Sequence, residues 1–160
     1  MTRIAALVFA CLALVATSAA CAPPQPAAQA TLLSGPWAGH SICVDKVRNP
    51  ACKDETIVYR FVRTAPHAAI LYADKILAGK REPMGALAMQ LGQDDRSATA
   101  HFAWGRGSGT WTYAMTNDAT LTGTLHSGAD HALARNVDAH RVDDDDLPAA
   151  PPLADYGTPH

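Results

Sequence analysis

The chain has 160 residues, with 13 Lys and Arg against 15 Asp and Glu and a formal net charge of −2. This near-neutral balance, with the cations scattered along the chain, excludes the basic stripe of a nucleic-acid-binding protein. Hydrophobic residues make up 48% of the chain, and a body of this size buries enough surface to fold without a structural metal or many disulfides.

The first twenty residues have the three parts of an export signal. Arg3 precedes the apolar run 4–16, and the small residues 18–20 follow it, which is the order found in secretory signals. The apolar run is too short for a membrane span, which needs about 20 residues. We therefore expect residues 1–20 to direct export, so that the mature protein is periplasmic, anchored at the outer membrane or secreted.

Cys21 comes directly after this segment and leaves two interpretations open. It stands where a bacterial lipoprotein carries its lipid, with residues 21–34 as a flexible tether, and such a lipid is the only membrane contact we expect. However, Ser18 occupies the place where lipoproteins favour a large aliphatic residue. Ordinary signal cleavage would instead leave Cys21 as a loose thiol, which needs a partner or a modification.

From Gly35 to Val142, short apolar or β-branched runs alternate with turn clusters, which is typical of an all-β sandwich or barrel. Short turns between successive runs favour an eight-stranded antiparallel up-and-down barrel over residues 35–142, because closure removes exposed strand edges. The expected strands are 37–44, 55–63, 67–77, 84–91, 97–104, 110–115, 119–126 and 131–142.

We also expect one disulfide within residues 35–142 and a disordered segment after them. Cys43 and Cys52 enclose a short loop, and in an exported protein we expect them to form a disulfide. After the last strand, the four aspartates 143–146 lead into a proline-rich stretch. An acidic block followed by prolines predicts a solvated, disordered tail over residues 143–160.

Gly35-Pro36-Trp37 resembles the Gly-x-Trp motif that opens the first strand of lipocalins and other calycins. The resemblance implies that Trp37 packs beneath an arginine of the last strand, at Arg135 or Arg141, of which we take Arg135 as the closing partner. No helix follows the last strand and no later lipocalin motif is present, so the helix-free, avidin-like members are equally similar.

Other segments resemble a group of small exported bacterial proteins without assigned activity. The similar residues lie around the cysteines, at 42–46 and 51–55, and in 73–76 before Gly79. This resemblance implies a fold and an exported location, and it carries no catalytic residues.

Nothing in the chain predicts catalysis or a cofactor. The glycines of 105–109 lie between two expected strands and not before a helix, so they form a hairpin turn and not a phosphate loop. Ser108 lacks the Gly-x-Ser-x-Gly frame of a nucleophile elbow, because Arg106 occupies its first glycine position. Four histidines also lack the spacing of a zinc site, and we expect them at the surface or in turns: His101, His126, His131 and His140.

The aromatic residues carry the functional hypothesis. Alternation along the strands predicts that Phe102, Trp104, Trp111 and Tyr113 surround one space together with Leu121 and Leu125. An eight-stranded barrel is either filled by side chains or holds one small ligand. We expect a non-catalytic barrel that binds a small apolar or amphipathic molecule, with these candidate contacts: Tyr59, Phe102, Trp104, Trp111 and Tyr113. The alternatives are a packed barrel with an envelope structural or interaction role, and a periplasmic zinc-binding protein.

Overall fold

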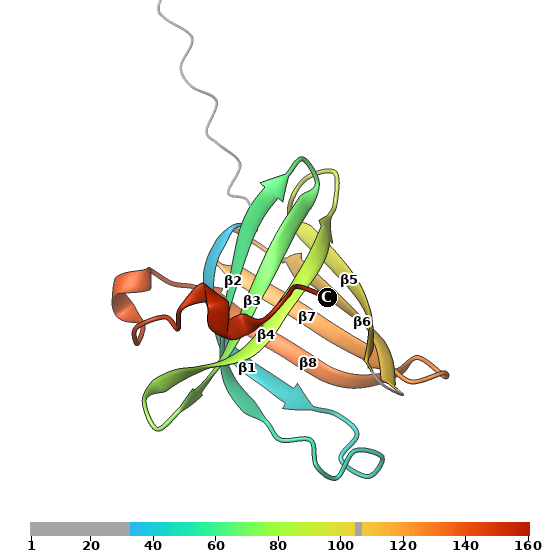
Figure 1. Ribbon diagram of the computed structural model, residues 1–160. Helices are drawn as coiled ribbons and strands as arrows, with labels where there is room; N and C mark the ends of the chain where they lie inside the picture. The colour runs from blue at the N-terminus through green and yellow to red at the C-terminus, as the bar shows by residue number, and fades with distance from the viewer. Residues whose placement is uncertain (1–32, 105–106) are drawn as a thin grey trace, which may run out of the picture.

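The computed structural model describes residues 33–104 and 107–160, and within them it confirms the eight-stranded, antiparallel up-and-down barrel (Figure 1). Each strand pairs with the next along the chain, and β1 closes the barrel against β8. The strands are β1 (Gly35–Cys43), β2 (Glu55–Ala65), β3 (Ala68–Leu77), β4 (Lys80–Leu91), β5 (Ser97–Trp104), β6 (Gly107–Met115), β7 (Thr120–Ser127) and β8 (Ala132–Arg141). Two short 3-10 helices follow, η1 (Asp144–Asp146) and η2 (Leu153–Tyr156). No helix in the described residues is long and apolar enough to cross a membrane.

One end of the barrel is closed by Trp37. Its side chain is fully buried, and its Nε1–H donates a 2.9 Å hydrogen bond to the carbonyl oxygen of Leu33. The guanidinium carbon of Arg141 lies 4.2 Å from the centre of the Trp37 ring, a cation–π contact. The pairing of an arginine with Trp37 therefore exists, but its partner is Arg141 and not Arg135.

The register of the barrel explains this correction. Antiparallel pairing of β1 with β8 sets Trp37 opposite Arg141, whereas Arg135 lies opposite Cys43 at the far end of the strand. The two arginines share a face of β8, because they are separated by an even number of residues. The alternation of side chains along β8 therefore made both arginines candidates, and only the register of β8 against β1 distinguishes them.

Residues 33 and 34 also differ from the predicted tether. Leu33 is buried in the core, and its backbone N–H donates to the carbonyl oxygen of Asp95 at 3.1 Å. The carbonyl oxygen of Ser34 accepts a 2.7 Å hydrogen bond from Arg141. The predicted signal, Cys21 and the rest of the tether lie outside the described residues.

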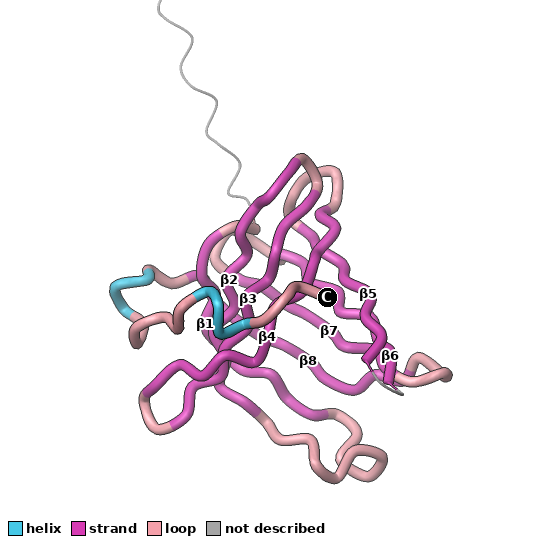
Figure 2. Tube along the Cα trace, viewed as in Figure 1, coloured by secondary structure: helices cyan, strands magenta, loops and turns pink. Residues whose placement is uncertain are grey.

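The segment 143–160 packs on the outside of the barrel, so the predicted disordered tail is wrong. Figure 1 shows it crossing β2, β3 and β4, and Figure 2 shows its two short helices on that path. Tyr156 is buried with its ring edge against Tyr72 of β3, at 5.1 Å between ring centres. Asp144 accepts a 2.8 Å hydrogen bond from Arg60 of β2. These partners lie on distant strands, so the composition of the tail gave no sign of them.

The disulfide is confirmed, because Cys43 and Cys52 are bonded with their Cα atoms 6.1 Å apart. It closes the loop between β1 and β2 at the barrel end opposite Trp37.

Replacing both cysteines, Cys43→Ser with Cys52→Ser, should lower the free energy of unfolding by about 2.5 to 3 kcal/mol, because the short loop is then unconstrained in the unfolded chain. Urea unfolding of the oxidised protein and of the double variant measures the difference. The reduced wild-type protein is the control and should match the variant; equal stability of the oxidised protein and the variant would contradict the expectation.

Candidate functional site

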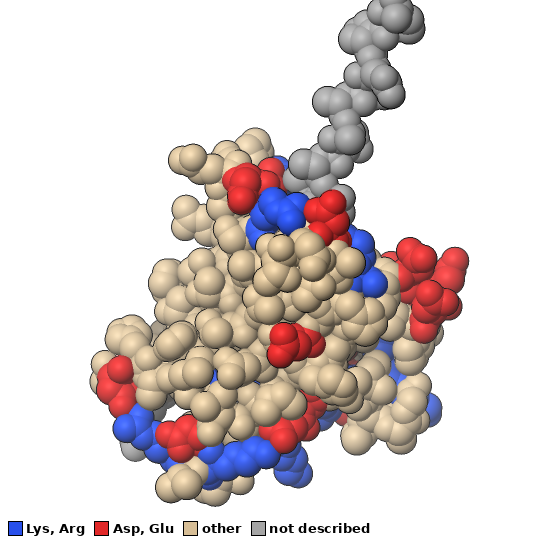
Figure 3. Space-filling model, turned by 180° about the vertical axis from the view of Figure 1, so that it is seen from behind, with Lys and Arg blue, Asp and Glu red and all other residues tan. Residues whose placement is uncertain are grey.

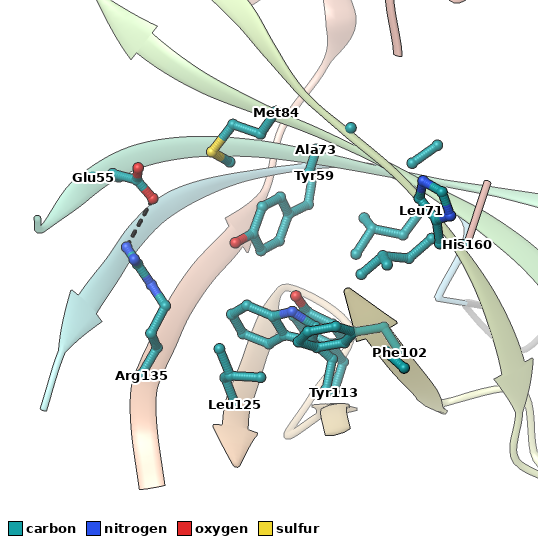
Figure 4. Close-up of a pocket in the computed structure, with 15 residues that line it drawn as sticks. Glu55, Tyr59, Leu71, Ala73, Met84, Phe102, Tyr113, Leu125, Arg135 and His160 are labelled. Carbon is teal, nitrogen blue, oxygen red and sulfur yellow. Dashed lines mark hydrogen bonds and ion pairs between the residues drawn. The ribbon is translucent and has the colours of Figure 1, made fainter. Parts of the chain in front are cut away.

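A pocket of about 330 Å³ occupies the barrel interior on the side away from Trp37 (Figure 4). Its walls come from β2 to β8, with one residue of the C-terminal segment, His160. Most lining side chains are apolar or aromatic. The lining residues are Glu55, Tyr59, Leu71, Ala73, Met84, Gly85, Ala86, Leu87, Phe102, Ala103, Trp111, Tyr113, Leu125, Arg135 and His160.

Four of the five predicted aromatic contacts stand in this wall: Tyr59, Phe102, Trp111 and Tyr113. In Figure 4, Phe102, Tyr113 and Leu125 lie across the pocket from Tyr59. The side chain of Trp104, the fifth predicted contact, lies outside what the structure describes. Leu121 is fully buried in the packed core and does not line the pocket.

Tyr113 is the centre of the aromatic cluster. It stacks on Trp111 with 5.5 Å between ring centres and 11° between planes. It also meets Tyr59 and Phe61 edge to face, at 5.7 and 5.4 Å between centres. Such offset and edge-on arrangements are the favourable ones for aromatic pairs, so the ring set forms a preformed wall.

Small residues explain why the ring of Tyr113 fits at all. A Cβ atom added at Gly123 of β7 would lie 2.5 Å from Cδ1 of the Tyr113 ring, and one at Gly109 would lie 2.7 Å from Cζ of Phe102. Both glycines therefore make room for an aromatic side chain on a neighbouring strand. Ala73, Ala86 and Ala103 line the pocket with short side chains, which leave more of its volume open than larger residues would.

Arg135 and Glu55 form the polar part of the wall, and Glu55 was not among the predicted contacts. The guanidinium of Arg135 donates to Glu55 Oε2 at 2.7 Å and to Ser41 Oγ at 2.8 Å. It also donates to the carbonyl oxygen of Lys53 at 2.9 Å. Figure 4 shows the Glu55–Arg135 pair beside the Tyr59 hydroxyl. One side of an otherwise apolar pocket thus offers charged and hydroxyl groups.

The buried tyrosines stay uncharged at neutral pH. Burial raises the pKa of Tyr59 above its ordinary value and raises the pKa of Tyr113 well above it, with a further increase from the neighbouring Tyr59. On the outer face, burial and then the nearby Asp74 carboxylate raise the pKa of Tyr156 to about 12. The pocket wall at Tyr59 and Tyr113 is therefore a neutral surface.

Alkaline pH should destabilise the fold through these tyrosines. Each of these tyrosines has a higher pKa in the folded protein than in the unfolded chain, where the value is about 10. Its contribution to the free energy of unfolding is complete below about pH 10 and is lost as the pH rises through the pKa of the folded state. We expect the free energy of unfolding to begin falling near pH 10 and to fall further towards pH 12. Urea titrations at stepped pH measure this fall, and Tyr156→Phe should make it shallower. An unfolding free energy that stays constant through this window would contradict the expectation.

The surface carries no broad area of one charge on the face shown in Figure 3, where acidic and basic side chains lie side by side near the edges. Within the described residues, no three His, Cys, Asp or Glu side chains are grouped closely enough to hold a metal ion. His101 contacts Thr110 Oγ1 and His126 contacts the carbonyl oxygen of His131, each at 2.9 Å. The four histidines considered for zinc therefore do not converge.

Comparison with models of known protein families, with curated proteins and with solved structures finds no match to this chain.

Proposed function

We propose that this protein is an exported barrel that binds a small apolar or amphipathic molecule in the pocket beside Tyr113, without catalysing a reaction. The observation that carries the proposal is a cavity of about 330 Å³ with mostly apolar walls. This volume falls within the range of about 300 to 1,000 Å³ typical of ligand sites, whose walls are likewise apolar with a few placed polar groups.

The contrast between the two halves of the barrel favours binding over a purely structural role. Around Trp37 the interior is filled by buried side chains such as Ile57, Phe61 and Leu121. On the pocket side, Trp111 itself and the lining residues Met84 and Leu87 are only partly buried, because the cavity lies beside them. A barrel kept only for mechanical or interaction purposes has no need of this hollow, because voids cost stability.

The chemistry of the wall indicates the ligand class. A flat or branched apolar group suits the space between Trp111, Phe102 and Leu125, because aromatic side chains offer large apolar contact surfaces. A hydroxyl, carbonyl or other polar end suits the Tyr59 and Arg135 side of the pocket. An amphipathic molecule satisfies both sides.

We further propose a calycin-like relationship and an exported location. The Gly35-Pro36-Trp37 opening, the closed barrel and the Arg141–Trp37 contact support the relationship. The signal-like segment 1–20 and the Cys43–Cys52 disulfide support export, since disulfides persist in oxidising compartments. Attachment through a lipid at Cys21 remains part of the proposal as an alternative to a soluble form.

Trp111→Ala tests the proposed function. Trp111 is partly buried and lines the pocket. We therefore expect its loss to lower the free energy of unfolding by less than the about 3 to 5 kcal/mol that removal of a fully packed tryptophan costs. Binding of the apolar fluorophore N-phenylnaphthylamine should weaken about tenfold or more, since a buried aromatic contact contributes on the order of 1.5 kcal/mol or more.

The matched control is Trp37→Ala, at the packed end. It should show the full stability loss while the folded fraction keeps its affinity for the fluorophore. If Trp111→Ala shows the full loss instead and the wild-type protein binds no fluorophore, the packed structural barrel replaces the binding proposal.

A further inference from the structure

The barrel is weakly joined at one place, the seam between β4 and β5. In the described chain these strands share the residue pairs Gln90 with Thr99 and Leu91 with Ala98, against eight pairs between β5 and β6. Beyond these two pairs, β5 diverges from β4. The pocket reaches this divergence, because Ala86 and Leu87 of β4 and Ala103 of β5 all line it.

Residues 157–160, which we call the gate, cover the β4 side of the seam. The backbone N–H of Ala88 donates to the carbonyl oxygen of His160 at 2.8 Å, and the N–H of His160 donates to the carbonyl oxygen of Ala86 at 3.3 Å. This is the bonding of a strand neighbour at an otherwise open sheet edge. Figure 1 shows the chain ending between β4 and β5, and His160 itself lines the pocket.

The gate is built to move separately from the segment that precedes it. Tyr156 is buried against Tyr72 and fixes the segment to β3. The next residue, Gly157, has φ 71° and ψ −168°, a backbone conformation that is essentially open to glycine alone. Residues beyond it are exposed or half-buried. Rotation at Gly157 can therefore release the gate while Tyr156 stays in place.

The other approach to the pocket is held more firmly. The loop between β1 and β2 is closed by the Cys43–Cys52 disulfide, and Arg135 joins it to β8 through hydrogen bonds to Lys53 and Glu55. A covalent link and a charged hydrogen-bond network are stronger ties than backbone hydrogen bonds such as those at Ala86 and Ala88, which water replaces on opening.

We propose that the seam between β4 and β5 is the entrance to the pocket and that residues 157–160 are its gate, hinged at Gly157. This inference rests on the proposed function, and it adds where the apolar ligand enters. The ligand displaces the backbone of His160 from Ala86 and Ala88, passes between β4 and β5, and reaches the aromatic wall, after which the gate closes again.

Stopped-flow binding of N-phenylnaphthylamine to the full chain tests the entrance. Ala88→Pro removes the N–H that holds the His160 carbonyl, at an edge position where proline is tolerated. His160→Pro removes the other donor and changes no barrel strand. Each variant should raise the association and dissociation rates together, by about two- to tenfold, the factor that one lost hydrogen bond represents.

Arg48→Ala is the matched control, because Arg48 pairs with Asp130 across the loops at the disulfide end. It should leave both rates unchanged. If Arg48→Ala speeds binding while both gate variants bind at the wild-type rate, the ligand enters through the barrel end and the proposal is overturned. If the wild-type protein binds no fluorophore, the proposed function fails, and the entrance fails with it.

Hydrogen exchange reports on the gate without any ligand. The amide of Ala88 faces the gate, whereas its neighbour Met89 pairs with Ala69 inside the sheet. We expect the Ala88 amide to exchange at least about tenfold faster than that of Met89, because local opening needs less free energy than unfolding of the sheet. Equal exchange rates would show that the gate opens only with the sheet, and would overturn the proposal even if the fluorophore binds.

Discussion

Arg81→Ala should lower the free energy of unfolding by about 3 to 5 kcal/mol, because it leaves the charge of Asp74 buried without its partner. The side chains of Asp74 and Arg81 are 0% and 1% exposed. Nε of Arg81 donates to Asp74 Oδ2 at 2.8 Å, and a terminal nitrogen of the same guanidinium forms an ion pair with that oxygen at 2.6 Å. The pair lies on the outer face of the hairpin formed by β3 and β4, beneath the segment that carries Tyr156.

Two controls separate a buried unpaired charge from a general loss of contacts. Lys75→Ala removes an exposed pair with Glu82 on the same hairpin and should cost less than about 1 kcal/mol. Replacing both buried partners, Asp74→Leu with Arg81→Met, removes the charges together and should recover most of the stability. Urea unfolding measures all three variants. An Arg81→Ala protein no less stable than Lys75→Ala would contradict the expectation.

Gly39→Ala should cost more than about 4 kcal/mol, because the added methyl group meets backbone that cannot move aside. A Cβ atom at this position would overlap the carbonyl oxygen of Asp138 and lie 2.6 Å from the Cα of Ala139. These residues belong to β8, where it pairs with β1 to close the barrel. The substitution therefore acts on closure itself.

Gly79→Ala is the control, since a Cβ atom there would meet no atom within 4 Å. Its φ of 76° is unfavourable for alanine, so it should cost about 1 kcal/mol through backbone strain alone. Circular dichroism and urea unfolding compare the two variants. A Gly39→Ala protein as stable as Gly79→Ala would show that β1 and β8 do not approach this closely.

The fold could be predicted because its signals are local. Apolar alternation and turn residues locate each strand, and the observed bounds differ from the predicted ones by at most four residues. Apart from the loop 44–54, short turns join the consecutive strands. Such connections leave few topologies, of which the closed barrel removes the strand edges. The disulfide was predictable for the same reason, since both cysteines flank one turn.

The site could be predicted only in part. Alternation placed Phe102, Trp111 and Tyr113 on one inner face, but the space before them depends on glycines and alanines contributed by other strands, such as Gly123. The choice between Arg135 and Arg141 depends on the register across β1 and β8. The packing of 143–160 depends on Tyr72 and Arg60, which lie far away in the chain.

Native mass spectrometry of the mature protein purified from its source tests the binding account most directly. The protein should carry one small apolar or amphipathic molecule per chain, and Trp111→Ala, purified in the same way, should carry markedly less. A folded wild-type protein that has only the mass of the chain, and that takes up no added N-phenylnaphthylamine, would contradict the account.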